Sequence, residues 1–141
     1  MPLIISDTNN YTRSFNKSIF NKILIKSLKY LKISSKIIFI TFISDYRMKK
    51  LNYMFKKNNK STDVLSFNYD NKMNEVLGEI FISTNYCKKN IKTNNNSLKK
   101  EIILIAIHGI LHLIGYNHTK KEDEKKMFML QNKLYEKFIK E

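Results

Sequence analysis

The segment of residues 98–114 constrains the fold of this chain more than any other part of the sequence. It has the length of a helix, and apolar side chains would lie on nearly every side of that helix. These side chains are Ile102, Ile103, Ile105, Ala106, Leu111 and Leu113. A helix that is apolar all round is stable only where other elements cover it. We therefore expect a central, buried helix with the rest of the 141 residues packed around it.

All three histidines of the chain, His108, His112 and His118, fall within the string HGILHLIGYNH at the end of this segment. His108 and His112 are four residues apart, so a helix stacks them on one face. Gly115 can adopt positive φ and end the helix, which lets the chain turn back and present His118. A lone histidine on an apolar helix is usually a packed core residue, but three at this spacing predict one metal site.

Three imidazoles leave one coordination position open, which is typical of a catalytic zinc with a bound water. We expect one Zn²⁺ per chain, although other divalent ions such as cobalt, nickel or manganese can occupy the same ligands. The histidine spacing is also that of the metzincin proteases, in which a glutamate follows the first histidine as general base. Here that position is Gly109, so a metallopeptidase-like hydrolase remains only as an alternative.

The string HGILHLIGYNH resembles the H-G-x-L-H-L-x-G-Y-D-H signature of the YbeY family of metal-dependent endoribonucleases. Two further blocks agree with that family, LNYMFKKNNKSTDVLSF at residues 51–67 and LGEIFIS at residues 77–83. The resemblance implies cleavage of single-stranded RNA, maturation of the 3′ end of small-subunit (16S) rRNA, and ribosome quality control. It also implies partners: rRNA and the small ribosomal subunit, one of its proteins, and a ribosome-assembly GTPase.

The chain departs from the family pattern at two positions. Lys56 stands where the family has an arginine, so the resemblance assigns it the phosphate contact, next to a metal-bound water. Lysine is a point charge and cannot grip a phosphate with two parallel hydrogen bonds, and neighbouring Lys57 is an alternative. Asn117 replaces an aspartate; it can orient an imidazole or shape the bend after Gly115, but it cannot relay a proton. These departures leave open a ribosome-binding assembly factor with a mainly structural metal.

Three further polar residues are expected near the cleft: Asp63 and Ser66 in the TDVLSF block, and Glu79 in LGEIFIS. Asp63 can equally cap local backbone, and Glu79 can be a surface partner of a lysine. The general base stays open between metal-bound hydroxide, a carboxylate of the TDVLSF block, and an activated RNA 2′-hydroxyl. A 2′-hydroxyl mechanism leaves a cyclic phosphate and is confined to RNA.

The net charge of +14 favours a phosphate-bearing partner. Nearly all of it comes from lysine, a composition that AT-rich genomes also produce, so the charge supports an RNA partner without proving one. The longest apolar run, residues 102–107, is far shorter than the roughly 20 residues that a bilayer span needs. The start of the chain lacks a basic leader with an apolar core, and Cys87 is the only cysteine. We expect a cytoplasmic protein with no membrane contact.

The remaining pattern predicts the elements around the central helix. An amphipathic helix follows Ser14 as N-cap, a strand spans residues 36–43, and Ser44 or Asp45 caps a second helix. Strands are expected at residues 63–69 and 76–83, with a turn between them. Thr119 and Glu122 read as a capping box that starts a last helix. The whole is an α+β fold of one domain, residues 1–141, and the resemblance implies a small, mixed, mostly parallel sheet.

Overall fold

Four strands and five helices make up the part of the chain that the computed structural model describes, residues 3–13, 15–69, 75–94 and 97–140. In chain order they are β1 (Leu3–Ser6), α1 (Lys17–Tyr30), β2 (Ile37–Ile43), α2 (Asp45–Lys56), β3 (Val64–Asn68), β4 (Val76–Ser83), α3 (Thr84–Asn94), α4 (Leu98–Leu113) and α5 (Lys121–Ile139).

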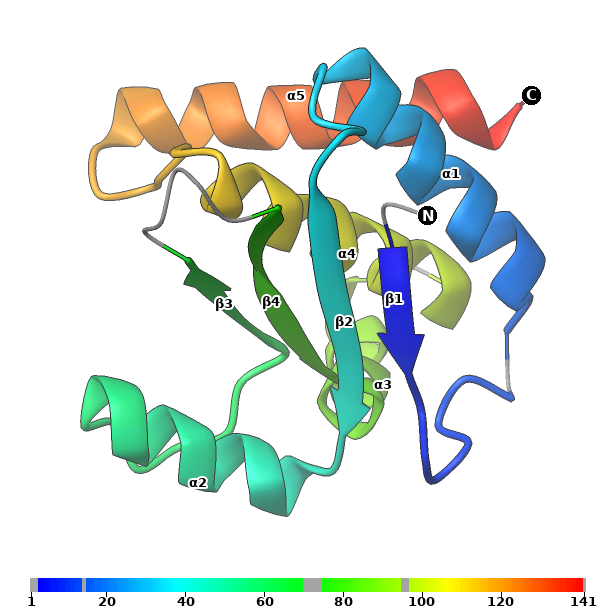
Figure 1. Ribbon diagram of the computed structural model, residues 1–141. Coiled ribbons are helices and arrows are strands. Elements are labelled where there is room, and N and C mark those ends of the chain that lie inside the picture. Colours follow the sequence, from blue (N-terminus) through cyan, green and yellow to red (C-terminus); the bar gives the residue numbers. More distant parts are fainter. Residues whose placement is uncertain (1–2, 14, 70–74, 95–96, 141) are drawn as a thin grey trace.

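The strands form one sheet in the order β1-β2-β4-β3 (Figure 1). β1 pairs with β2 and β2 with β4 in parallel, while β3 runs antiparallel to β4. The α+β class and the mixed, mostly parallel sheet are therefore confirmed. The two runs after α2 are also sheet neighbours as expected.

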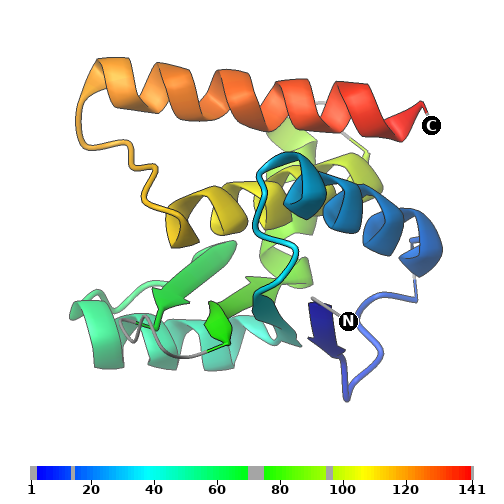
Figure 2. The ribbon, with the colours of Figure 1, turned by 45° about the horizontal axis from the view of Figure 1, so that its top comes forward.

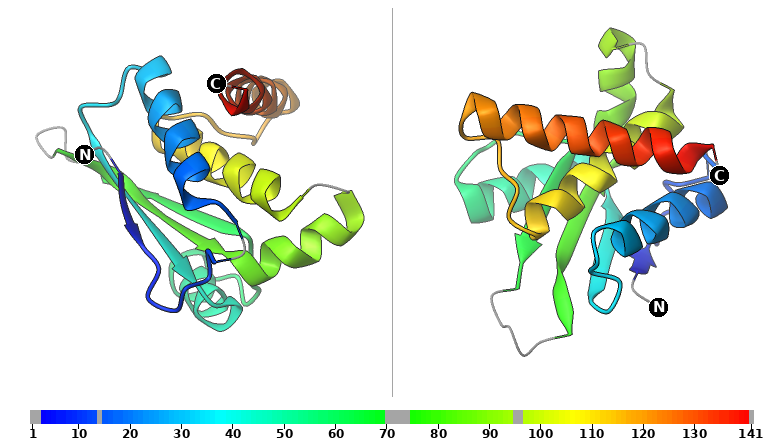
Figure 3. Two further views of the ribbon diagram at one scale, coloured as in Figure 1. Left: turned by 90° about the vertical axis from the view of Figure 1, so that its right-hand side faces the viewer. Right: turned by 90° about the horizontal axis from the view of Figure 1, so that it is seen from above.

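Successive side chains of each strand point to opposite faces of the sheet, and the two faces differ in what they pack against. Ile38, Ile40, Ile80 and Ile82 are fully buried and join the main core with α1, α4 and α5. The opposite face carries a smaller cluster in which Met48 of α2 packs on side chains of the sheet. Figure 3 shows α1, α4 and α5 on one side of the sheet and α2 toward the other.

The central position of α4 is confirmed. Apart from its two half-buried histidines, the helix is buried without interruption between Glu101 and Leu113, against the sheet on one side and α5 on the other (Figure 2). The helix ends where the sequence indicated, with Ile114 at the C-cap and Gly115 at φ +104°. None of the helices in the described ranges is long and apolar enough to cross a membrane.

The starts of two helices differ from expectation. The N-cap of α1 is Asn16, whose Oδ1 accepts from the backbone N–H of Ser18 and Ile19, and the expected cap Ser14 lies outside the described residues. The capping box at the last helix is wrong. α5 begins at Lys121 with Lys120 as its N-cap and no side-chain cap, one residue later than the capping box requires, and the Thr119 hydroxyl donates to Oδ1 of Asn117, 3.1 Å away.

Two elements have no counterpart in the sequence-based expectations. β1 has only four residues, too few for an alternating pattern to stand out, and it forms the edge of the sheet. α3 follows β4 without a loop, and the N–H of Tyr86 donates to the Ser83 hydroxyl at 3.2 Å where the strand becomes a helix.

Candidate functional site

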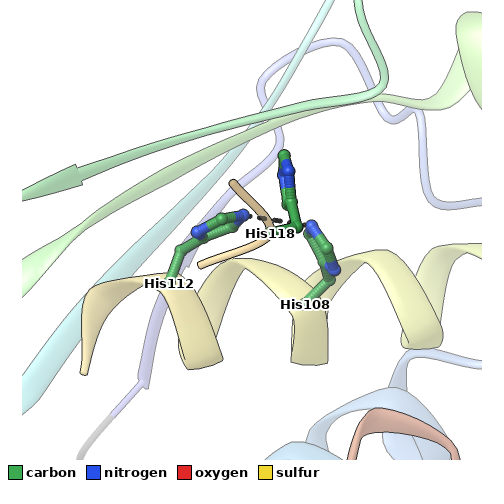
Figure 4. A group of neighbouring side chains, drawn as sticks. All are labelled: His108, His112 and His118. Atoms are coloured by element: carbon green, nitrogen blue, oxygen red, sulfur yellow. Dashed lines mark hydrogen bonds between the residues drawn. The ribbon is translucent and has the colours of Figure 1, made fainter. Parts of the chain in front are cut away.

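The three histidines converge on one point at the end of α4 (Figure 4). His108 and His112 lie on successive turns of the helix, and their Nε2 atoms are 3.1 Å apart. His118 reaches the same point from the loop after Gly115, and one nitrogen from each ring lies within 4.8 Å of the others. Two ligands at 2.0–2.1 Å from a tetrahedral zinc are about 3.4 Å apart. The described histidines therefore fit a single divalent ion.

Gln131 of α5 fixes the orientation of the first histidine. Its Oε1 lies 2.9 Å from Nδ1 of His108, and only 7% of the residue is exposed. With the amide oxygen as acceptor, Nδ1 carries the proton and Nε2 of the neutral ring is free to bind a metal. Sequence reasoning missed this residue. The available signal was a glutamine on the apolar stripe of the last helix, between Met127 and Leu134.

Burial keeps two of the imidazoles neutral. It lowers the pKa of His108 and, together with the two neighbouring imidazoles, lowers the pKa of His112 to about 4. Metal binding requires the neutral ring, and at pH 7 neither ring has to lose a proton first. The geometry and the electrostatics of this cluster thus favour the same state.

The histidines open onto a cleft of about 550 Å³ between α4, β3 and the end of α2. Lys56, the last residue of α2, lines this cleft together with Lys60. Its positive charge contributes to the lowered pKa of His112. Lys57 lies elsewhere: it adopts a left-handed conformation at φ +57° and lines a separate surface groove. The structure thus places Lys56, and not Lys57, beside the histidines.

Asn52 anchors the rim of the cleft, and sequence reasoning did not single it out. It is only 4% exposed, although it is polar and lies in the middle of α2. Its side-chain Nδ2 donates to the carbonyl of Lys60 at 2.9 Å, and its carbonyl accepts from the N–H of Asn58 at 3.3 Å. These two hydrogen bonds attach the loop that carries Lys60 to α2 at Asn58 and at Lys60.

Asp63 and Ser66 both line the cleft. Asp63 also borders a smaller cavity of about 280 Å³ that His108 and Gln131 share. Burial raises the pKa of the Asp63 carboxyl, and the nearby Thr62 hydroxyl, 3.3 Å away, only partly offsets this. The Ser66 hydroxyl donates to the carbonyl of Gly109 at 3.2 Å and so ties β3 to the histidine helix.

The structure does not bring Glu79 or Asn117 into the cleft. Glu79 faces the other side of the sheet and accepts a hydrogen bond from the Tyr69 hydroxyl at 3.3 Å. Asn117 is exposed, and its Oδ1 accepts from both the N–H and the hydroxyl of Thr119. The geometry gives Asn117 a place in shaping the turn before His118.

The close packing around Gly109 leaves no room for a glutamate after the first histidine of α4. A Cβ atom built there lies 3.0 Å from both Cγ2 of Ile80 and Oγ of Ser66. A longer side chain would meet the sheet rather than the histidine cluster, because α4 packs closely on β3 and β4. The proton acceptor of a metzincin has no room at this position.

Comparisons with known proteins agree with these features. The model of the family described as Endoribonuclease YbeY matches residues 4–139. Endoribonuclease YbeY of Phytoplasma mali is 41% identical over 79% of this chain and 81% of the relative. That of Sulfurihydrogenibium sp. is 34% identical over 95% and 91%. The solution structure of TM1509 from Thermotoga maritima has a TM-score of 0.66 at 29% identity, covering 96% of this chain and 87% of that one.

Proposed function

This chain belongs to the YbeY family of endoribonucleases, and we propose that it is a metal-dependent enzyme that cleaves single-stranded RNA. The observation that carries this proposal is the three-histidine cluster, which opens onto a cleft that also contains a lysine. We further propose that its substrate is the 3′ end of precursor small-subunit (16S) rRNA and that it acts in ribosome quality control.

His108, His112 and His118 would hold the metal, for which zinc fits the all-nitrogen ligand set. A bound divalent ion supplies Lewis acidity toward an RNA phosphate oxygen. The protein side chains do the rest. Gln131 holds His108 in the tautomer that binds a metal. Neutral imidazole ligands would not offset the positive charge of a bound ion, which would then stabilise the extra negative charge that the phosphate gains in the transition state.

Lys56 would hold the substrate phosphate, and its place in the lining of the same cleft as the histidines supports this role. Its ammonium group balances one phosphate charge without fixing the orientation of the phosphate, as an arginine would. Asp63 can accept or hold a proton at its carboxylate, since burial raises its pKa and it faces the histidine side of the cleft. Attack by the RNA 2′-hydroxyl would leave a cyclic phosphate, whereas attack by water would leave a linear one.

The proposed partners are rRNA within the small ribosomal subunit, a protein of that subunit and a ribosome-assembly GTPase, all in the cytoplasm. The net charge of +14 supports a partner rich in phosphate. A second candidate function is a ribosome-binding assembly factor with a structural metal. Lys56, in place of an arginine that grips phosphate in two places, favours this candidate.

Cleavage of a precursor small-subunit rRNA 3′ fragment tests the proposal. Wild type, metal-stripped and reloaded protein are compared with His112→Ala, and the metal content of each preparation is measured. We expect cleavage only by metal-loaded wild type. A fully loaded protein that cuts no single-stranded RNA, alone or with small subunits, would instead support the assembly factor. A deoxy substrate and analysis of the product ends identify the attacking group.

A further inference from the structure

The outer face of α2 is apolar where a helix on the surface of a domain is usually polar. Tyr46, Tyr53 and Met54 are 67%, 55% and 63% exposed. The opposite face of the same helix holds Met48, which packs on the sheet, and Asn52, which is also buried. Packing within the domain therefore does not account for the exposed side chains.

These side chains line a groove of about 630 Å³ that is bordered by three lysines, Lys49, Lys50 and Lys57. The Nζ of Lys50 lies 4.5 Å from the centre of the Tyr46 ring. None of the described residues that line the groove carries a carboxylate. The acidic residue at the start of α2, Asp45, accepts hydrogen bonds from Ser61, Ser83 and Lys89 instead.

The groove adjoins the cleft of the histidine site. From the last residue of α2 onward, the side chains alternate between the two: Lys56, Asn58 and Lys60 line the cleft, whereas Lys57 and Asn59 line the groove. One short wall therefore separates them. A chain that leaves the cleft over this wall arrives on the outer face of α2, which lies at the opposite end of the molecule from α1 (Figure 1).

We propose that the α2 groove binds single-stranded RNA that extends from the cleft; this inference rests on the proposed function. Exposed aromatic rings with lysines between them are the means by which proteins hold single strands without reading their sequence. Tyr46 and Tyr53 are seven residues apart, so their rings are offset by about 10.5 Å along the helix and can stack on separate bases. The lysines neutralise the phosphates between those bases.

RNA suits this groove better than a protein partner does. The groove continues a cleft proposed to hold RNA, and among the described residues that line it the charged side chains are all lysines. Binding of fluorescein-labelled oligouridylates of five and fifteen nucleotides, followed by fluorescence anisotropy with a chelator present, tests the proposal without any cleavage. The double variant Tyr46→Ser/Tyr53→Ser removes both rings. Tyr46→Phe/Tyr53→Phe keeps them, and Tyr30→Ser removes a ring on α1 that also has a lysine, Lys137, beside it.

We expect the double serine variant to bind the fifteen-nucleotide RNA at least about tenfold more weakly, as the loss of two stacking rings implies. The affinity for the pentanucleotide should change less than threefold, because we expect this short RNA to occupy the cleft alone. The phenylalanine pair and Tyr30→Ser should bind like wild type. In Lys49→Gln/Lys50→Gln, the slope of log affinity against log salt should fall by about 1.4, for two phosphate contacts on a single strand.

Wild-type affinity of the serine variant for the longer RNA would overturn the proposal and leave a protein as the occupant of the groove. An equal loss on both oligonucleotides would also overturn it, because the rings would then act within the cleft. Thermal unfolding of each variant establishes that it is folded. If wild type binds the longer RNA through these rings, but the metal-loaded protein cuts no RNA in the separate cleavage assay, the nuclease is refuted and this inference stands.

Discussion

The two walls of the cleft are built in opposite ways. One wall belongs to the core: His108 lies on the buried helix α4, and its partner Gln131 lies on α5 with only 7% of its surface exposed. The other wall is surface: Lys56 is an exposed residue at the end of a helix, and Lys60 follows in a loop. The proposed metal ligands on α4 are thus positioned by the packing of the core, whereas the lysines proposed to meet the phosphate are exposed.

This difference separates two kinds of substitution. Changes in the wall of α4 and α5 should alter metal binding and stability together, because each side chain there also fills the core or satisfies a buried partner. Substitutions of the exposed lysines on the other wall, Lys56 and Lys60, should alter RNA binding or cleavage and leave the free energy of unfolding almost unchanged.

The largest effect should come from removing a histidine, and the two ends of the cluster should differ. His108→Ala and His118→Ala should both lose the metal under conditions in which wild type retains it. His108→Ala should also lower the free energy of unfolding of the metal-free protein by about 1–3 kcal/mol, since the amide of Gln131 is left without its partner. His118 is exposed, so its removal should change that free energy by less than about 0.5 kcal/mol.

Metal analysis and urea unfolding in the presence of a chelator measure both quantities on the same preparations. Equal losses of stability in the two variants would contradict the division of the site into a buried and an exposed part.

Gln131→Ala should have the next largest effect. Without the acceptor at Nδ1, His108 can rotate and can adopt the tautomer that does not bind, so metal affinity should fall about 10- to 100-fold. Competition with a chromophoric chelator measures the affinity. Gln131→Glu keeps an acceptor oxygen and should retain most of it. If Gln131→Ala binds metal as tightly as wild type does, packing alone holds His108 in place.

The local part of the site could be predicted from the sequence, because its geometry depends on neighbours in the chain. A spacing of four residues on a helix brings His108 and His112 together, and the left-handed turn at Gly115 returns His118. Gln131 and His108 are 23 residues apart and meet only because α5 packs on α4. No spacing rule connects such a pair before the packing of the two helices is known.

The same distinction applies to the fold. Strand β2 and helix α2 have clear patterns of apolar residues, and both lie close to the positions that the sequence predicts. The capping box failed because the last helix begins one residue later, with Lys120 as its N-cap, and Thr119 lies in the preceding turn, where its hydroxyl donates to Asn117. Local propensities name the candidate caps, but they do not determine at which of two adjacent residues a helix begins.

Acid should destabilise the metal-free protein through the buried histidines. The folded-state pKa of His112 is lowered to about 4, below its usual value of 6.5, and that of His108 is lowered as well. Between these pH values the unfolded chain binds protons that the folded protein does not. The contribution of the two histidines to the free energy of unfolding should therefore be fully present above pH 6.5 and should fall as the pH drops toward 4. Asp63, whose pKa is raised, acts in the opposite direction.

Thermal unfolding with a chelator, from pH 7 to pH 4.5, measures this dependence. The His112→Gln variant should show a clearly flatter decline than wild type. Parallel curves would show that His112 does not set the acid stability.

The smallest effects should come from the exposed wall. Lys56→Arg restores a group that can hold a phosphate by two hydrogen bonds, so kcat/KM for RNA cleavage should rise by about two- to fivefold, while Lys56→Ala should lower it about tenfold. Lys29→Ala, an exposed lysine on α1 outside the cleft, serves as the control and should change nothing. Metal content and unfolding temperature should be the same in all of these variants. A Lys56 variant that lost metal or unfolded early would show that this wall is tied to the core after all, because its ammonium group would then be supporting the histidines rather than the substrate.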